Sequence, residues 1–154
     1  MYTLFLFLHS ALRWLVLGAL IYSIVRAYRG YTEHRDHNAT DNAWRHWTAT
    51  LAHIQLVAGM ILYSKSPAVS AFFAGLVGSD RITEPVFFSI IHISLMLLAI
   101  IVITIASALA KRKNTDRQKF KTILIGYGIA LMIIFIAIPW PFSPLAQRPL
   151  FRSL

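Results

Sequence analysis

The chain has 154 residues, of which 57% are hydrophobic and 14% charged, and its formal net charge is +9. Soluble domains average about 25% charged residues, so this composition favours a single membrane domain over residues 1–154. The absence of cysteine excludes disulfides, iron–sulfur ligation, thiolate metal sites and cysteine nucleophiles. We interpret the positive charge as a basic cytoplasmic face and predict no nucleic-acid partner.

Four apolar runs, taken in chain order, are long enough to cross about 30 Å of hydrocarbon as helices. They cover residues 3–25, 47–63, 86–110 and 122–138. The second run is the most polar of the four. Nothing basic precedes the first run, so we expect a retained helix rather than a cleaved signal peptide. The pattern predicts an all-α fold, namely an integral membrane four-helix bundle with up-down-up-down topology.

The basic residues predict the orientation of this bundle. Ten of the fifteen Lys and Arg residues lie in the stretches after the first and third predicted spans, namely Arg26, Arg29, Arg35, Arg45, Lys111, Arg112, Lys113, Arg117, Lys119 and Lys121. Short basic connections stay in the cytoplasm, so both termini are predicted to lie outside. We expect a multi-pass protein of the bacterial inner (cytoplasmic) membrane, with the lipid bilayer as its first partner.

Three histidines fall inside the predicted spans: His9, His53 and His92. Ionisable groups at membrane depth are costly and usually face the bundle interior, so each is a functional hypothesis. At 1.5 Å per residue, His9 and His92 both lie roughly 9–12 Å from the outer surface, and His53 lies about one turn deeper. Gln55 is interpreted as a residue that hydrogen-bonds between helices.

Matched depth on diagonal helices suggests a shared cofactor. The first and third helices of an up-down-up-down bundle lie diagonally across its core. Two imidazoles at equal depth there can hold a planar macrocycle, and a bis-imidazole iron suits electron transfer. We therefore predict one haem b with His9 and His92 as axial ligands of the iron, and His53 as the alternative ligand.

Arginines supply candidate partners for the acidic groups of such a cofactor. Arg13 follows His9 by one helical turn and therefore shares its helix face. A buried guanidinium needs an anionic partner, and no Asp or Glu occurs within the predicted spans. We expect Arg13 to bind a haem propionate or a quinone oxygen. Arg81 and Arg148, on the outer side, are additional candidates for the propionates.

The stretches HSALRW (His9, Arg13), LAHIQL (His53) and IIHISL (His92) carry a family resemblance. With four spans around them, the chain resembles small four-helix membrane cytochromes b of the cytochrome b561-like kind. The resemblance implies bis-histidine haem b and electron transfer between quinone and a redox partner protein. It also implies a role as a quinone-linked oxidoreductase or as its cytochrome b subunit. Dihaem members need four ligating histidines, so the three spans with histidine here favour one haem.

Two other functions remain open at this stage. Histidines from three helices at similar depth are also suited to copper or zinc, which describes a metal-binding membrane protein or transporter with a three-histidine site. Alternatively, the histidines only fasten helices together, and the chain is a non-redox accessory subunit of a membrane complex. A homodimer and a place in a larger complex are both compatible with the sequence.

Overall fold

The computed structural model describes residues 2–77, 83–143 and 146–149, and these residues form helices without any strand. The elements in chain order are α1 (Tyr2–Thr32), α2 (Ala39–Lys65), α3 (Pro67–Phe73), α4 (Glu84–Val86), the π-helical segment η1 (Phe87–His92), α5 (Ile93–Arg112) and α6 (Asp116–Ala137). Helix accounts for 82% of the structure. The predicted all-α class is therefore confirmed.

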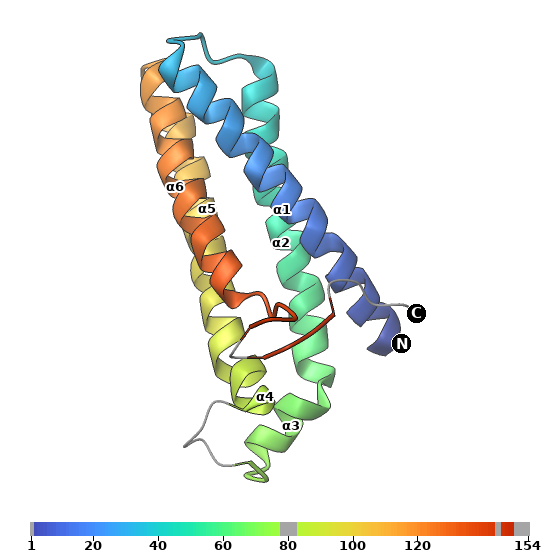
Figure 1. Ribbon diagram of the computed structural model, residues 1–154. Helices are drawn as coiled ribbons and strands as arrows, with labels where there is room; N and C mark the ends of the chain where they lie inside the picture. Colours follow the sequence, from blue (N-terminus) through green and yellow to red (C-terminus); the bar gives the residue numbers. More distant parts are fainter. Residues whose placement is uncertain (1, 78–82, 144–145, 150–154) are drawn as a thin grey trace.

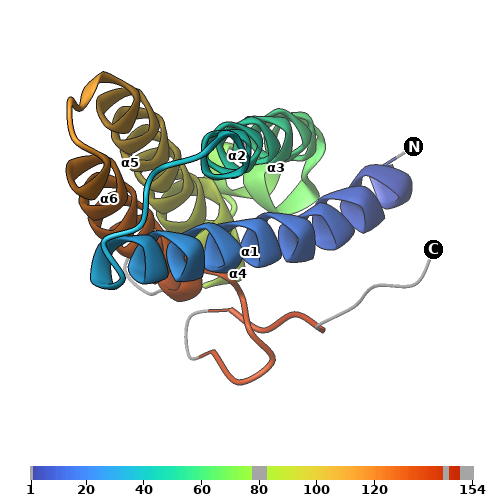
Figure 2. The ribbon, with the colours of Figure 1, turned by 90° about the horizontal axis from the view of Figure 1, so that it is seen from above.

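Four long helical segments run side by side: α1, α2, η1 continued by α5, and α6 (Figure 1). Helix α1 packs on α2 and α6, and α5 packs on the same two neighbours. Helices α1 and α5 are consequently placed diagonally to each other. Helix α1 is inclined to its neighbours, which the view from above shows most clearly (Figure 2).

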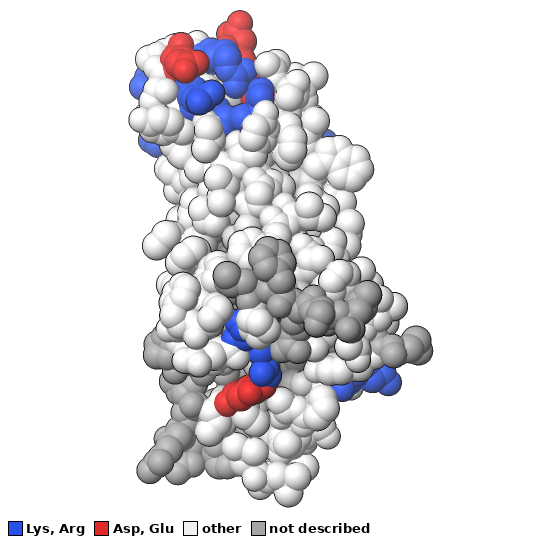
Figure 3. All heavy atoms as spheres, turned by 45° about the vertical axis from the view of Figure 1, so that its right-hand side comes forward, with Lys and Arg blue, Asp and Glu red and all other residues white. Residues whose placement is uncertain are grey.

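Three of these segments are long and apolar enough to cross a membrane: Tyr2–Thr32, Glu84–Arg112 and Asp116–Ala137. Helix α2 passes the same test only together with α3, from which it is bent by 58°. The described residues therefore hold three candidate spans, or four if the bent pair counts as one, as in a multi-pass membrane protein. On the face in Figure 3, most charged side chains gather at one end, a smaller charged group lies towards the other end, and a largely uncharged band separates them.

The helices extend past the apolar runs at the basic end. Arg26 and Arg29 lie in the last turns of α1, and Arg45 lies in α2, whereas all three were expected in a connection between spans. Hydropathy marks only the apolar part of a helix, but the backbone stays helical until a capping group ends it. At the start of α2 that group is Asn38, whose side chain accepts from the Asp41 N–H at 3.0 Å.

Asp41 completes this capping box and also holds two arginines. Its carboxylate accepts from the Asn38 N–H, and forms ion pairs with Arg26 at 2.7 Å and Arg35 at 2.8 Å. Burial by itself would raise the pKa of the Asp41 carboxyl. The hydrogen bonds from Arg35, Asn38 and Arg26 outweigh that effect and lower the pKa to about 2. One buried carboxylate on α2 thus links the end of α1, through Arg26, to the connection that follows it, through Arg35.

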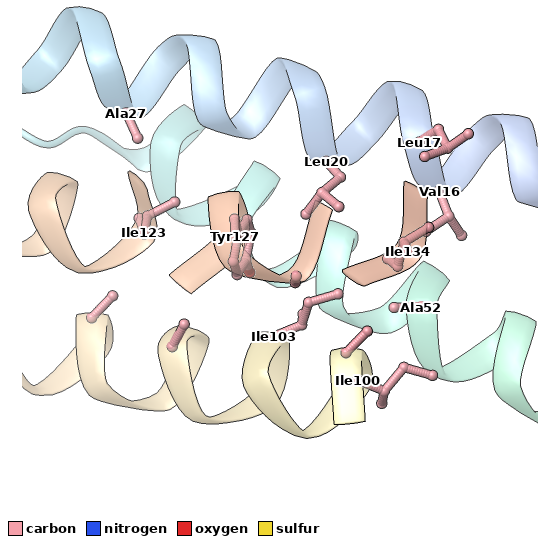
Figure 4. Close-up of a cluster of buried hydrophobic side chains, with 14 of the residues drawn as sticks. Val16, Leu17, Leu20, Ala27, Ala52, Ile100, Ile103, Ile123, Tyr127 and Ile134 are labelled. Atoms are coloured by element: carbon pink, nitrogen blue, oxygen red, sulfur yellow. The ribbon is translucent and has the colours of Figure 1, made fainter. Parts of the chain in front are cut away.

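Apolar side chains from all four long segments fill the interior, as the close-up shows for Leu20, Ala52, Ile103 and Tyr127 among others (Figure 4). Small residues bring α5 and α6 close together. A Cβ added to Gly126 would lie only 2.2 Å from the Ala106 Cβ. The helices α5 and α6 are therefore closely packed at this point, and a cavity lined by residues of α1, α2 and α5 lies towards the opposite end.

Candidate functional site: a histidine-lined cavity

A cavity of about 510 Å³ opens between the first turns of α1, the second half of α2 and the η1–α5 segment. Its lining includes His9, Gln55, His92, Met96 and Arg148. A smaller cavity of about 110 Å³ is lined by these same five residues and reaches Arg13 and Ser10 as well. Cofactor sites usually measure about 300–1,000 Å³, so the larger cavity is of suitable size.

The structure brings His9 and His92 together across this cavity. His9 lies two turns into α1, and His92 is the last residue of η1. The centroids of the two imidazole rings are 6.5 Å apart, and the ring planes form an angle of 70°. Both side chains are half-buried. Two helices that are not adjacent thus present imidazoles to one space.

His92 is held in a defined tautomer by the end of α6. Its Nδ1 lies 2.8 Å from the carbonyl oxygen of Ala137, the last residue of that helix. A carbonyl only accepts, so Nδ1 carries the proton and Nε2 is the basic nitrogen. Metal-binding histidines are commonly oriented by such a bond to a backbone carbonyl. The C-terminal carbonyl of α6, which has no intrahelical partner, is satisfied by the same bond.

A π-helical segment places His92 at this point. From Phe87 to His92 the backbone is π-helical instead of α-helical. Such turns are rare in proteins overall, but they are often found at functional sites. The widened turn is braced from α2, because the Tyr63 hydroxyl donates to the Ser89 carbonyl at 3.0 Å. The hydropathy pattern contains no signal for this change of helix type.

His9 lies close against α2. A Cβ added to Gly59 would be 3.2 Å from the His9 Cε1, so the missing side chain makes room for the ring. The Gln55 amide donates to the His9 carbonyl at 2.9 Å, as the interhelical interpretation of Gln55 predicts, and lies 3.4 Å from the His9 Nε2. The His9 Nδ1 is buried, and no hydrogen-bond partner for it lies among the described residues.

Two arginines border the histidines. Arg13 lines the smaller cavity, donates to Ser10 Oγ at 3.5 Å and lies over the Trp14 ring. Arg148 lines both cavities and forms an ion pair with Glu84. Arg81, the remaining arginine predicted for the propionates, lies outside the described residues. Two guanidinium groups therefore accompany the histidine pair in a lining that is otherwise mostly apolar.

His53 lies elsewhere. It is exposed, its Nδ1 is 2.7 Å from the Ala49 carbonyl, and its Nε2 is 3.3 Å from the Thr104 hydroxyl on α5. Neither cavity includes it. Within the described ranges, no three His, Cys, Asp or Glu side chains group as a metal site would require. His53 therefore links α2 to α5, and the three-histidine site of the alternative hypothesis does not form among the described residues.

Sequence reasoning missed Glu84, Phe88 and Tyr63. Glu84 and Phe88 hold Arg148 over the cavity. Glu84 forms an ion pair with Arg148, and the centroid of the Phe88 ring lies 5.2 Å from the Arg148 guanidinium carbon. The only available signal was a single carboxylate directly before Pro85, at the start of an apolar run. Its pairing with a residue 64 positions later has no local signature.

No protein-family model, curated protein or solved structure matches this chain. Any function must therefore be argued from the cavity and its residues.

Proposed function

We propose that the chain is a membrane protein that binds one haem b through His9 and His92 and transfers electrons, with quinone as a partner. The carrying observation is the pair of imidazoles, 6.5 Å apart, on opposite helices of an apolar cavity. This proposal follows the resemblance to small membrane cytochromes b.

The spacing of the rings fits two ligands on one metal ion. Metal–imidazole bonds of about 2.0 Å on both sides place two ring centres roughly 6 Å apart. The His92 Nε2 is the basic nitrogen of its ring, since Nδ1 is bonded to Ala137. The buried His9 Nδ1, which has no partner in the described part of the chain, also fits a residue that awaits a ligand. When bound, haem iron supplies reversible one-electron transfer.

The chain's own residues orient and shield such a group. Leu6, Phe88 and Ile100 line both cavities and keep water from the histidines. Arg13 and Arg148 offer guanidinium groups to propionates or to a quinone oxygen, because planar guanidinium donors match carboxylate oxygens. The ion pair with Glu84 keeps Arg148 at the cavity rather than in solvent.

The same proposal includes an up-down-up-down bundle of four spans in a bacterial inner membrane, with both termini outside. It is supported by the basic residues, which gather where α1 joins α2 and α5 joins α6. The histidine cavity lies towards the opposite end of these helices. Under the positive-inside rule, the cavity then faces the outer half of the membrane.

The test is a reduced-minus-oxidised visible spectrum of the detergent-purified protein, with a pyridine haemochrome assay for stoichiometry. One haem per chain is expected, and His9→Ala and His92→Ala should each abolish or strongly shift the haem absorbance. His53→Ala is the matched control, because it removes a histidine from the same helical bundle but not from the cavity. It should leave the spectrum unchanged.

Other outcomes would redirect the assignment. A colourless protein after expression with added haem precursor would contradict the proposal and favour an accessory subunit. A spectrum lost in His53→Ala but retained in His9→Ala would show that the ligand pair is wrong. Metal analysis of a colourless preparation would then show whether His9 and His92 bind a metal ion without haem.

A further inference from the structure

A second hollow lies far from the histidines, between α5 and α6 at the basic end. Its volume is about 520 Å³. Most of its lining is apolar and comes from both helices: Val102, Ile105, Ala106, Leu109, Ile125 and Gly126. Ile105, Leu109 and Ile125 are each about half exposed, at 52%, 46% and 51%. We call this hollow the α5–α6 groove.

The groove has a floor because its two helices touch at small residues. Gly126 has no side chain, and a Cβ there would lie 2.2 Å from the Ala106 Cβ. The helix backbones therefore approach closely at this point, while Ile105 and Ile125 stand on either side. The result is an apolar surface groove that runs along the two helices and has their closely packed backbones at its base.

One end of the groove is cationic. Lys113 caps the C-terminus of α5, and Lys121 lies in the second turn of α6; both line the groove together with Gln118 and Thr122. Neither lysine forms an ion pair with any residue that the structure describes. The neighbouring Lys119 differs, since it is paired with Asp116 at 2.8 Å. The groove is therefore apolar along its length and carries two available ammonium groups at its mouth.

We propose that the α5–α6 groove binds an anionic phospholipid, with an acyl chain along Ile105, Leu109 and Ile125 and the headgroup phosphate on Lys113 and Lys121. The charge at the groove mouth is complementary to a phosphate. This mouth lies at the basic end, which faces the anionic cytoplasmic leaflet in the orientation proposed above, and basic pockets between helices bind such headgroups. A zwitterionic lipid lacks the net charge that two lysines select. The site does not depend on haem binding.

Native mass spectrometry of the full-length protein in detergent measures this binding. Equal amounts of dioleoyl phosphatidylglycerol and dioleoyl phosphatidylcholine are added, and the retained lipid is counted. Phosphatidylglycerol should be preferred, and the double variant K113Q/K121Q should lose most of that preference, by roughly fivefold for each lysine. The matched control K111Q/R112Q removes two exposed cations from the same end outside the groove, and should retain it.

A second variant tests the groove itself. Ile125→Trp places a larger side chain over the groove, leaves both lysines in place, and should reduce phosphatidylglycerol retention at unchanged helix content by circular dichroism. Equal retention of the two lipids, or an equal loss in the K111Q/R112Q control, would overturn the proposal. So would a stable dimer that Ile125→Trp dissociates, because a second copy would then occupy the groove.

Discussion

Replacing Asp41 by asparagine tests the ion-paired cluster at the basic end. The side chain is buried, with only 5% of the residue exposed, and its carboxylate binds Arg26 and Arg35. These bonds, against the opposing effect of burial, lower the carboxyl pKa from 3.8 to about 2. A difference of that size corresponds to about 2–3 kcal/mol of unfolding free energy at neutral pH. Asparagine keeps the shape but removes the charge, so most of that free energy should be lost.

The pH dependence gives the sharper form of this prediction. Because the pKa of Asp41 is lower in the folded state, its contribution is complete above the ordinary pKa and is lost as the pH falls towards about 2. At pH 7, Asp41→Asn should lower the midpoint of thermal unfolding by roughly 5–10 °C. As the pH falls from about 4 towards 2 the two midpoints should approach each other, because the carboxylate of the folded wild type becomes protonated only near pH 2. Circular dichroism in detergent measures both midpoints.

Asp36→Asn is the matched control, because Asp36 is an exposed carboxylate in the same connection. It should change the midpoint little at either pH, as exposed charges contribute about 0–1 kcal/mol. A gap between wild type and Asp41→Asn that stays constant from pH 7 to acid would refute the reasoning. The loss would then come from the shape of the cap rather than from its charge.

Two further predictions concern packing and the π-helical segment. Gly126→Ala should destabilise the protein by about 1–3 kcal/mol, because the added Cβ meets Ala106. The control Gly128→Ala has open space around it and should be neutral or stabilising. Equal shifts of the unfolding midpoint in the two variants would contradict the contact with Ala106. Tyr63→Phe removes the donor to the Ser89 carbonyl and should cost about 0.5–1.5 kcal/mol. It should also alter the haem spectrum if haem is bound, and an unchanged melting midpoint would show that the brace is dispensable.

Hydropathy was sufficient to predict the all-α class and the three candidate spans, because each contains a long apolar run of the kind that crosses lipid as a helix. Matched depth also placed His9 and His92 near the same level, and the structure brings their rings together. Depth does not specify the side of a helix. His53 and Gln55 are two positions apart, hence about 200° apart around α2. Gln55 contacts His9, so His53 points away from the cavity.

Other features depend on contacts that no local pattern encodes. Asp41 binds Arg26 and Arg35, which lie 15 and 6 residues before it in the sequence. A count of charges along the chain only indicates that this stretch is a basic, solvent-exposed connection. Glu84 and Arg148 meet only after the chain has passed through α5 and α6. The π-helical turn before His92 likewise depends on backbone geometry, for which side-chain composition is a poor guide. Sequence reasoning was therefore most successful for spans and least successful for pairings between them.

The short connections of this molecule also bear on how it is assembled. Residues 33–38 join α1 to α2, residues 113–115 join α5 to α6, and the stretch between α2 and η1 is much longer. The chain thus consists of two helical hairpins, each closed by a tight turn, and helices so linked form contacts early because little loop-closure entropy is lost. Each hairpin is a natural unit of insertion during synthesis. Two co-expressed fragments divided near residue 75 would retain both turns intact, and their reassociation would then depend on the packing of α1 on α6, of α2 on α5, and of α3 on α4 and η1.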